Sequence, residues 1–126
     1  MGPTMPNATV LLVEDELFIS MLTQDVLESA GLTVIVAYDG LEALELLRAH
    51  PEIDLLFTDV NLPSLDGRVL AQRAMVERPE LQLILTSGRH RLSAEEIPDD
   101  GKFLPKPYSP RELMDLVQSE LDQRPA

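Results

Sequence analysis

Short runs of apolar residues alternate along the chain with stretches in which apolar residues recur every three or four positions. The runs are rich in Val, Ile and Leu and have the length of strands buried on both faces of a parallel sheet. Strands are predicted over residues 8–13, 33–37, 53–58, 81–86 and 102–104. Because helical patterns separate them, the sequence predicts one α/β domain with right-handed crossovers and helices on both faces of the sheet.

The helical patterns carry recognisable start and stop signals. The first helix follows residue 16 and ends at Gly31, a residue that suits a helix C-terminus. Its apolar residues at spacings that fall on one face are Phe18, Met21, Leu22 and Val26. A second helix ends before Pro51 and is striped by Leu41, Leu44 and Leu47. A third covers residues 69–76.

The last two predicted helical segments differ in how clearly the sequence supports a full helix. Ser93 and Glu96 form a capping-box pattern, but Pro98 follows too soon for more than a turn or two of helix. The fourth helical segment is therefore predicted to be shortened. Ser109 and Pro110 open the last helix, since Pro suits the first helical position. The predicted inner face of that helix comprises Leu113, Leu116, Val117 and Leu121.

Size and charge narrow the classes of function. The chain has 126 residues, which is enough for one domain, and we place that domain at residues 8–122 with flexible tails at 1–7 and 123–126. With 22 acidic and 10 basic residues, the net charge of −12 disfavours direct binding of nucleic acid. Without cysteine, the chain has no disulfide or zinc-thiolate site. No stretch is apolar enough to span a membrane, and a cytoplasmic location is expected.

Side chains suited to binding ions stand where predicted strands end. Glu14 and Asp15 follow the first strand, Asp59 the third, Ser87 the fourth and Lys106 the fifth. The carboxyl ends of parallel strands share one edge, so these residues should converge there. Clustered carboxylates repel one another unless a cation lies between them, and their oxygens favour Mg²⁺. An Asp carboxylate can also accept a phosphoryl group. Taken alone, each residue has an ordinary explanation, such as a turn or a helix N-terminus.

The order and spacing of these residues resemble the receiver domain of two-component response regulators, over Val10 to about Leu121. The stretches that carry the resemblance are Val13-Glu14-Asp15-Glu16, Thr58-Asp59-Val60-Asn61-Leu62-Pro63, Asp66-Gly67, Thr86-Ser87-Gly88 and Phe103-Leu104-Pro105-Lys106-Pro107. The runs over residues 86–89 and 103–110 look most similar to stand-alone or hybrid-kinase receivers common in α-proteobacteria. The resemblance implies a CheY-like, flavodoxin-like (βα)5 fold, with a doubly wound parallel sheet in strand order 2-1-3-4-5.

The resemblance also implies roles for the residues at the strand ends. Asp59 matches the phosphoacceptor and Asp15 the acidic ligand of Mg²⁺. Glu14 matches a neighbour that usually acts through water, although Asp is common there, and Asn61 matches the residue whose backbone carbonyl binds the metal.

Ser87 matches the hydroxyl residue that turns toward the phosphoryl group, and Lys106 the lysine that pairs with its oxygens. Lys106-Pro107 matches a peptide bond that is usually cis. Phe103 matches an aromatic residue that changes rotamer on activation.

The expected function is a phosphorylation-driven switch that assists its own phosphorylation and dephosphorylation and is not otherwise an enzyme. A histidine kinase or a histidine phosphotransfer protein would supply the phosphoryl group, and an unidentified protein would read the switched face. Two alternatives remain within the family: a module that works without phosphorylation, and a receiver excised from a hybrid histidine kinase. A third is a Mg²⁺-dependent phosphatase, which usually has a second acid where this chain has Asn61.

Overall fold

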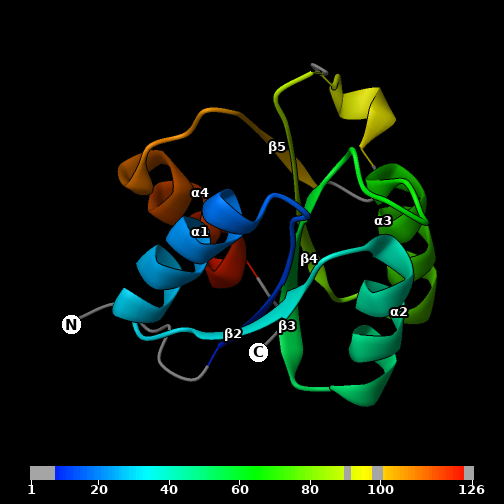
Figure 1. The fold of residues 1–126 in the computed structure, drawn as a ribbon. Coiled ribbons are helices and arrows are strands. Elements are labelled where there is room, and N and C mark those ends of the chain that lie inside the picture. Colours follow the sequence, from blue (N-terminus) through cyan, green and yellow to red (C-terminus); the bar gives the residue numbers. More distant parts are fainter. Residues whose placement is uncertain (1–7, 90–91, 98–100, 124–126) are drawn as a thin grey trace.

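The structure is a computed structural model, and it describes residues 8–89, 92–97 and 101–123. Its centre is a sheet of five parallel strands in the order β2-β1-β3-β4-β5, as predicted (Figure 1). The strands are β1 (Thr9–Val13), β2 (Thr33–Ala37), β3 (Ile53–Asp59), β4 (Gln82–Ser87) and β5 (Lys102–Pro105). Each lies within about two residues of its predicted bounds. Apart from residue 123, the predicted tails at 1–7 and 123–126 lie outside the described residues.

Helices cover both faces of the sheet (Figure 1). The α-helices are α1 (Leu17–Ser29), α2 (Gly40–Ala49), α3 (Gly67–Glu77) and α4 (Pro110–Asp122). Figure 1 shows α1 and α4 on one face and α2 and α3 on the other. Two apolar clusters fill the layers between the helices and the sheet, one on each side. The doubly wound arrangement expected from the alternating patterns is confirmed.

The segment between β4 and β5 holds no α-helix within its described residues. A single 3-10 turn, η1 (Ala94–Glu96), stands where the fourth helical segment was predicted, so the predicted shortening is confirmed. The backbone N–H of Ser93 donates to Glu96 Oε1 at 3.0 Å, as the capping-box pattern indicated. Pro98 lies outside the described residues.

Most of the predicted apolar face of α1 points away from the core, although Val26 is half-buried against it. Phe18 and Met21 are 73% and 58% exposed, and Leu22 and the preceding Leu17 are also exposed. The helix instead buries Ser20, Thr23 and Leu27 against the sheet. The spacing predicted that these residues share a face, and most of that face points to solvent, because spacing alone does not determine which way a face points.

Small polar residues can take the inner side of α1 because their hydrogen bonds are satisfied there. Thr23 Oγ1 and Tyr108 Oη are hydrogen bonded at 2.8 Å, which joins α1 to the segment before α4. The remaining predicted faces fit better. In α2, Leu44 and Leu47 are buried while Leu41 is exposed; α4 buries its predicted inner residues Leu113, Val117 and Leu121 and half-buries Leu116.

Two helix boundaries depend on a glycine, one before the start of β2 and one beside the end of β3. Gly31 ends α1 with a φ of +92°, a left-handed conformation that favours glycine. Gly67 begins α3 beside the end of β3, where a Cβ atom would overlap the carbonyl oxygen of Asp59. Its backbone N–H donates to the carbonyl of Val60 at 2.8 Å. This close approach holds the loop after β3 against the strand end that it follows.

Candidate phosphoryl-accepting site

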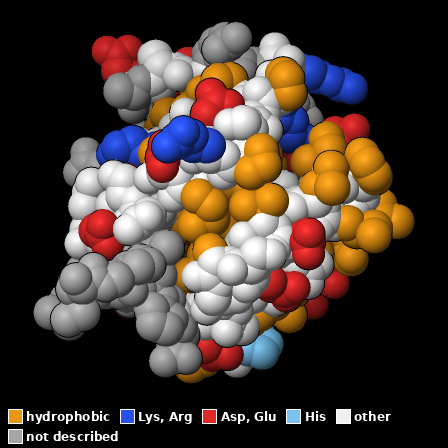
Figure 2. Space-filling view, turned by 90° about the vertical axis from the view of Figure 1, so that its left-hand side faces the viewer, with side chains coloured by type: hydrophobic (Ala, Val, Ile, Leu, Met, Phe, Trp, Pro, Cys, Tyr) orange, Lys and Arg blue, Asp and Glu red, His pale blue; other side chains and the backbone are white. Residues whose placement is uncertain are grey.

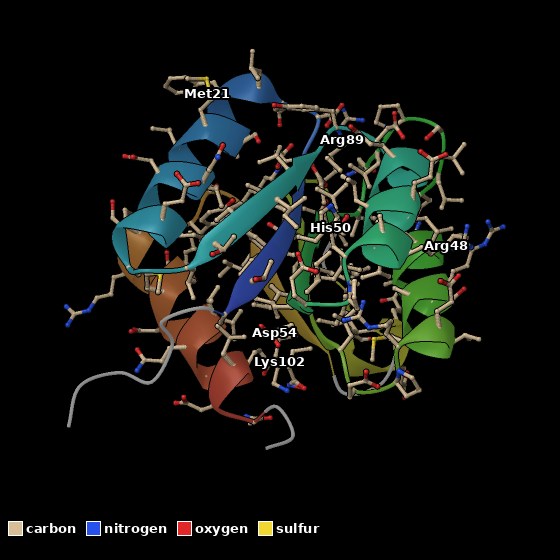
Figure 3. The ribbon with its side chains drawn as sticks, turned by 90° about the horizontal axis from the view of Figure 1, so that it is seen from below. Met21, Arg48, His50, Asp54, Arg89 and Lys102 are labelled. Atoms are coloured by element: carbon tan, nitrogen blue, oxygen red, sulfur yellow. The ribbon has the colours of Figure 1, made fainter. Side chains whose placement is uncertain are left out.

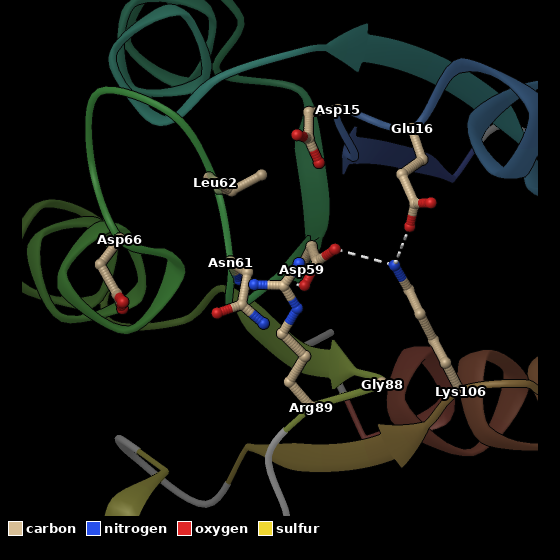
Figure 4. Close-up of a pocket in the computed structure, with 9 residues that line it drawn as sticks. All are labelled: Asp15, Glu16, Asp59, Asn61, Leu62, Asp66, Gly88, Arg89 and Lys106. Atoms are coloured by element: carbon tan, nitrogen blue, oxygen red, sulfur yellow. Dashed lines mark hydrogen bonds and ion pairs between the residues drawn. The ribbon is translucent and has the colours of Figure 1, made fainter.

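The carboxyl ends of β1, β3, β4 and β5 surround a cavity of about 700 Å³ (Figure 4). Asp15, Asp59, Asn61 and Lys106 line it, so four residues predicted from the sequence lie together. Glu14, whose side chain is buried, lies directly behind this edge in contact with Lys106. The predicted convergence of the strand ends is therefore confirmed.

Asp59 is held at the end of β3 by contacts to both of its carboxylate oxygens. Oδ1 accepts a hydrogen bond from the backbone N–H of Asn61 at 3.0 Å. Oδ2 accepts one from Lys106 Nζ at 2.8 Å (Figure 4). Asp59 is largely buried but still lines the cavity. These two contacts fix the direction of a carboxylate that a reactant in the cavity can reach.

Lys106 places one ammonium group among several carboxylates. Its Nζ lies 2.7 Å from Glu14 Oε1, 2.8 Å from Asp59 Oδ2 and 3.5 Å from Glu16 Oε1. Burial alone would lower the pKa of this ammonium, but its close contacts with the carboxylates of Asp59 and Glu14 reverse that effect and raise the pKa above its ordinary value. Lys106 is therefore positively charged throughout the physiological pH range.

Glu14 is the most buried acid of the site, at 1% exposed. Burial raises the pKa of its carboxyl group, and the ion pair with Lys106 opposes that shift. Oε2 accepts the backbone N–H of Glu16 at 3.1 Å. Oε1 is close to Lys106 but lacks the alignment of a hydrogen bond. One buried oxygen is thus held by charge alone and has capacity for a further partner.

A group of three acids meets the requirements of a small hard cation. Glu14, Asp15 and Asp59 each offer a carboxylate oxygen, and these oxygens lie within 4.8 Å of one another. It is the one such group among residues 8–89, 92–97 and 101–123. Oxygen ligands, including the incompletely bonded Glu14 oxygen, suit Mg²⁺. The residues present therefore fit the cation that the sequence predicted.

Ser87 and Asn61 are joined across the cavity mouth. Ser87 Oγ accepts a hydrogen bond from Asn61 Nδ2 at 3.2 Å and another from the backbone N–H of Arg89 at 3.0 Å. The Lys106-Pro107 peptide bond is cis, as predicted. Phe103, on β5, is half-buried against the apolar cluster on the α2 and α3 side. Its predicted change of rotamer stays a prediction.

Sequence reasoning assigned no role to Glu16 and Asp66, which line the cavity, and it placed Arg89 beside the acceptor as a residue that could tune water access, without the sign of that effect. Glu16 lies within ion-pair distance of Lys106, and its position directly after Asp15 was the available signal. Asp66 caps α3 by accepting the backbone N–H of Arg68 at 2.8 Å. Arg89 extends its side chain from the end of β4 toward Asp59 (Figure 4).

A family model for the response regulator receiver domain matches residues 10–118. The chain belongs to this family. It is a receiver domain of the two-component type, whose members are phosphoacceptor switches that work through an Asp residue.

Curated relatives extend the match to named proteins. Sensor kinase CckA of Brucella abortus (strain 2308) is 38% identical over 122 residues, which cover 94% of this chain and 13% of that protein. Response regulator GtcR of Aneurinibacillus migulanus is 34% identical over 120 residues, which cover 91% of this chain and 48% of that protein. The chain thus spans less than half the length of these relatives. The first match confirms the predicted similarity to α-proteobacterial receivers.

Solved receivers share the fold. A response regulator receiver protein from Sinorhizobium medicae WSM419 matches with a TM-score of 0.87 and 28% identity, covering 94% of this chain and 98% of that one. The receiver domain of the hybrid histidine kinase CckA matches with a TM-score of 0.79 and 30% identity, covering 90% and 99%. Within the described part of the receiver, none of the helices has the length and apolarity needed to cross a bilayer.

Proposed function

We propose that this receiver accepts a phosphoryl group on Asp59 from a phosphohistidine of a histidine kinase or a histidine phosphotransfer protein. The observation that carries the proposal is the position of the Asp59 carboxylate, which lines an open cavity while Lys106 Nζ lies 2.8 Å from Oδ2. A carboxylate oxygen attacks phosphorus, and the bond from phosphorus to the donor nitrogen breaks with its electrons left on that nitrogen. Lys106 then neutralises charge on the phosphoryl oxygens.

Glu14, Asp15, Asp59 and the backbone carbonyl of Asn61 are the residues that would hold Mg²⁺ in this function. When bound, the cation offsets negative charge on the transferring oxygens. The chain's own residues do the positioning, because the Asn61 N–H and the Lys106 ammonium fix the two oxygens of Asp59. We infer that this arrangement lets the receiver assist its own phosphorylation and dephosphorylation.

Ser87 and Phe103 would carry the signal away from Asp59. The hydroxyl of Ser87 accepts its bond from Asn61 at the cavity mouth, so a phosphoryl group would compete for that hydroxyl. Phe103 pairs with Leu85 on β4 and lies two residues before Pro105, which is the β5 partner of Ser87. A protein that contacts the β5 side would then distinguish the two states.

The outer face of α1, formed by Leu17, Phe18, Met21 and Leu22, is the surface that suits the phosphodonor. Figure 2 shows hydrophobic side chains gathered on the side of the molecule that α1 and α4 form, and Figure 3 shows Met21 pointing outward. A groove of about 470 Å³ beside this face is lined by Leu22 and also by Lys106. An amphipathic donor helix on the outer face of α1 would therefore reach the site.

The deciding experiment is intact mass after incubation with Mg²⁺ and a small phosphodonor. The parent should gain one phosphoryl group and Asp59→Asn none. Asp54→Asn is the matched control, because Asp54 lies on the same strand but at its other end. A parent without an adduct that also fails to bind a phosphoryl mimic would instead favour a module that works without phosphorylation.

A second measurement tests the donor surface. Met21→Glu places a charge on the outer face of α1, where it should slow phosphotransfer from a phosphohistidine protein about tenfold through loss of apolar contact. Phosphorylation by the small donor should be unchanged, because Met21 does not line the site cavity. Equal slowing with both donors would show that the residue acts on the site and not on docking.

A further inference from the structure

Arg89 stands at the rim of the cavity, two residues after Ser87 at the end of β4. Its backbone N–H donates to Ser87 Oγ at 3.0 Å, so its main chain is tied to the same hydroxyl that Asn61 contacts. Figure 4 shows its side chain reaching from this rim toward Asp59 and Asn61. All three residues line the same cavity.

The charges around the cavity distinguish Arg89 from Lys106. Lys106 Nζ lies within ion-pair distance of Glu14, Glu16 and Asp59. The guanidinium of Arg89, by contrast, forms no ion pair with any residue in the described part of the chain, although it is the second cation of the cavity lining. Figure 4 shows Lys106 on one side of Asp59 and the guanidinium of Arg89 on the other, so the cation paired with carboxylates and the cation available to an incoming anion approach Asp59 from different sides.

We propose that Arg89 is a phosphoryl-binding arm, whose guanidinium contacts oxygens of the group on Asp59 from the side opposite Lys106. The inference rests on the proposed function of Asp59. A guanidinium is planar and presents paired N–H donors that match two oxygens of a phosphoryl group, whereas an ammonium acts as a point charge. Arg89 adds a second positive charge to a cavity whose other cation, Lys106, is already paired with carboxylates.

The role of Arg89 is binding and not proton transfer. In the transfer to Asp59, the new bond joins a carboxylate oxygen to phosphorus and the broken bond leaves its electrons on the donor atom, which takes a proton from solvent. Arg89 keeps its proton throughout, because an arginine guanidinium is not deprotonated in proteins. Its contribution should therefore be measurable with a mimic that undergoes no transfer.

Beryllofluoride in the presence of Mg²⁺ is that mimic, and fluorine NMR reports its binding to the full chain. Arg89→Gln should bind it about tenfold more weakly than the parent, which is the scale of a lost charge-assisted bond. Arg89→Lys should recover part of the loss because it keeps the charge but not the paired donors. Arg73→Gln is the matched control, since Arg73 is exposed on α3 away from the cavity, and it should bind as the parent does.

The affinity for Mg²⁺ in the absence of the mimic is a second readout, and it should not fall in Arg89→Gln as the affinity for the mimic does. Removing a positive charge near the acids should leave the binding of Mg²⁺ unchanged or tighter in Arg89→Gln, whereas a collapsed site would bind it more weakly. Equal mimic affinity in Arg89→Gln and the parent would overturn the inference while leaving the function of Asp59 intact. Failure of the parent itself to bind the mimic would overturn the proposed function and this inference with it.

Discussion

Both edges of the sheet bring carboxylates close to a lysine, but only one edge builds a site. At the carboxyl edge, Glu14 and Asp59 contact Lys106. At the opposite edge, Lys102 Nζ lies 3.6 Å from Glu120 Oε2, and Figure 3 shows Lys102 and Asp54 both at that edge. The two edges therefore share residue types, and their difference lies in geometry.

The difference is how deeply the cation is buried and what the oxygens face. Lys106 has 11% of its side chain exposed, whereas Lys102 has 43%. Asp54 Oδ2 accepts the backbone N–H of Thr9 at 2.9 Å and so supports the start of the sheet. At the carboxyl edge, Asp15 and Asp59 instead line an open cavity. Buried charge alone does not make a site; converging oxygens that face a cavity do.

The largest difference between the two edges should be in the free energy of unfolding that is lost when the lysine at each edge is replaced. Lys106→Met leaves Glu14 and Asp59 buried without their cation and should lower the free energy of unfolding by about 3 kcal/mol. Mg²⁺ should restore part of that loss by replacing the missing charge. Lys102→Met should cost less than about 1 kcal/mol, because the Lys102 ammonium is half in solvent. Urea unfolding with and without Mg²⁺ measures both, and equal losses would contradict the contrast between the edges.

A smaller difference, in Mg²⁺ affinity, is expected between variants of the two acids Glu14 and Glu16, which both lie close to Lys106. Glu14→Gln should weaken Mg²⁺ binding about tenfold, because it removes one charged oxygen from the three-acid group. Glu16→Gln should change the affinity by less than about threefold, since the Glu16 side chain is 62% exposed and lies outside that group. Calorimetric titration with Mg²⁺ checks both variants. A larger effect from Glu16 would reassign the cation ligands.

The smallest expected effect is a pH-dependent change in the free energy of unfolding when Glu120 is replaced. Burial raises the pKa of Glu120, so the folded chain binds its proton more tightly than the unfolded chain does. Its stabilising contribution is present below the ordinary value of 4.5 and is lost as pH rises through the folded pKa. Glu120→Gln should therefore match the parent near about pH 4 and exceed its unfolding free energy by at most about 1 kcal/mol near about pH 7.

Urea unfolding of Glu120→Gln and the parent at several pH values gives this comparison. A constant difference between the two chains, or a loss of stability in the variant near neutral pH, would show that the pair with Lys102 outweighs the cost of burying the carboxylate.

The fold and the composition of the site could be predicted because both follow from where strands end. Apolar runs located β1 and β3, and parallel strands necessarily bring Glu14, Asp59 and Lys106 to one edge. The direction of α1 could not be predicted, since the same spacing describes an inner or an outer face. Its buried Thr23 depends on a partner, Tyr108, that lies 85 residues away in the sequence.

Contacts of side chains in loops could be predicted only in part. The sequence indicated that Arg89 flanks the acceptor, but it gave neither the sign of its effect nor the contact of Glu16 with Lys106. Glu16 reaches Lys106 only because the turn after β1 directs it there, and Arg89 reaches the cavity from the end of β4. Neither position belongs to a periodic pattern, so neither has a face to predict. The folded arrangement of the two turns decides both contacts.

The measurement that tests the central claim most directly is the location of the phosphoryl group on the protein. Borohydride converts an acyl phosphate of Asp into homoserine, and peptide mass spectrometry then identifies its position after phosphorylation of the parent. The account predicts homoserine at position 59 and an unmodified carboxylate at positions 54 and 120. A label on another acid, at either edge of the sheet, would contradict it.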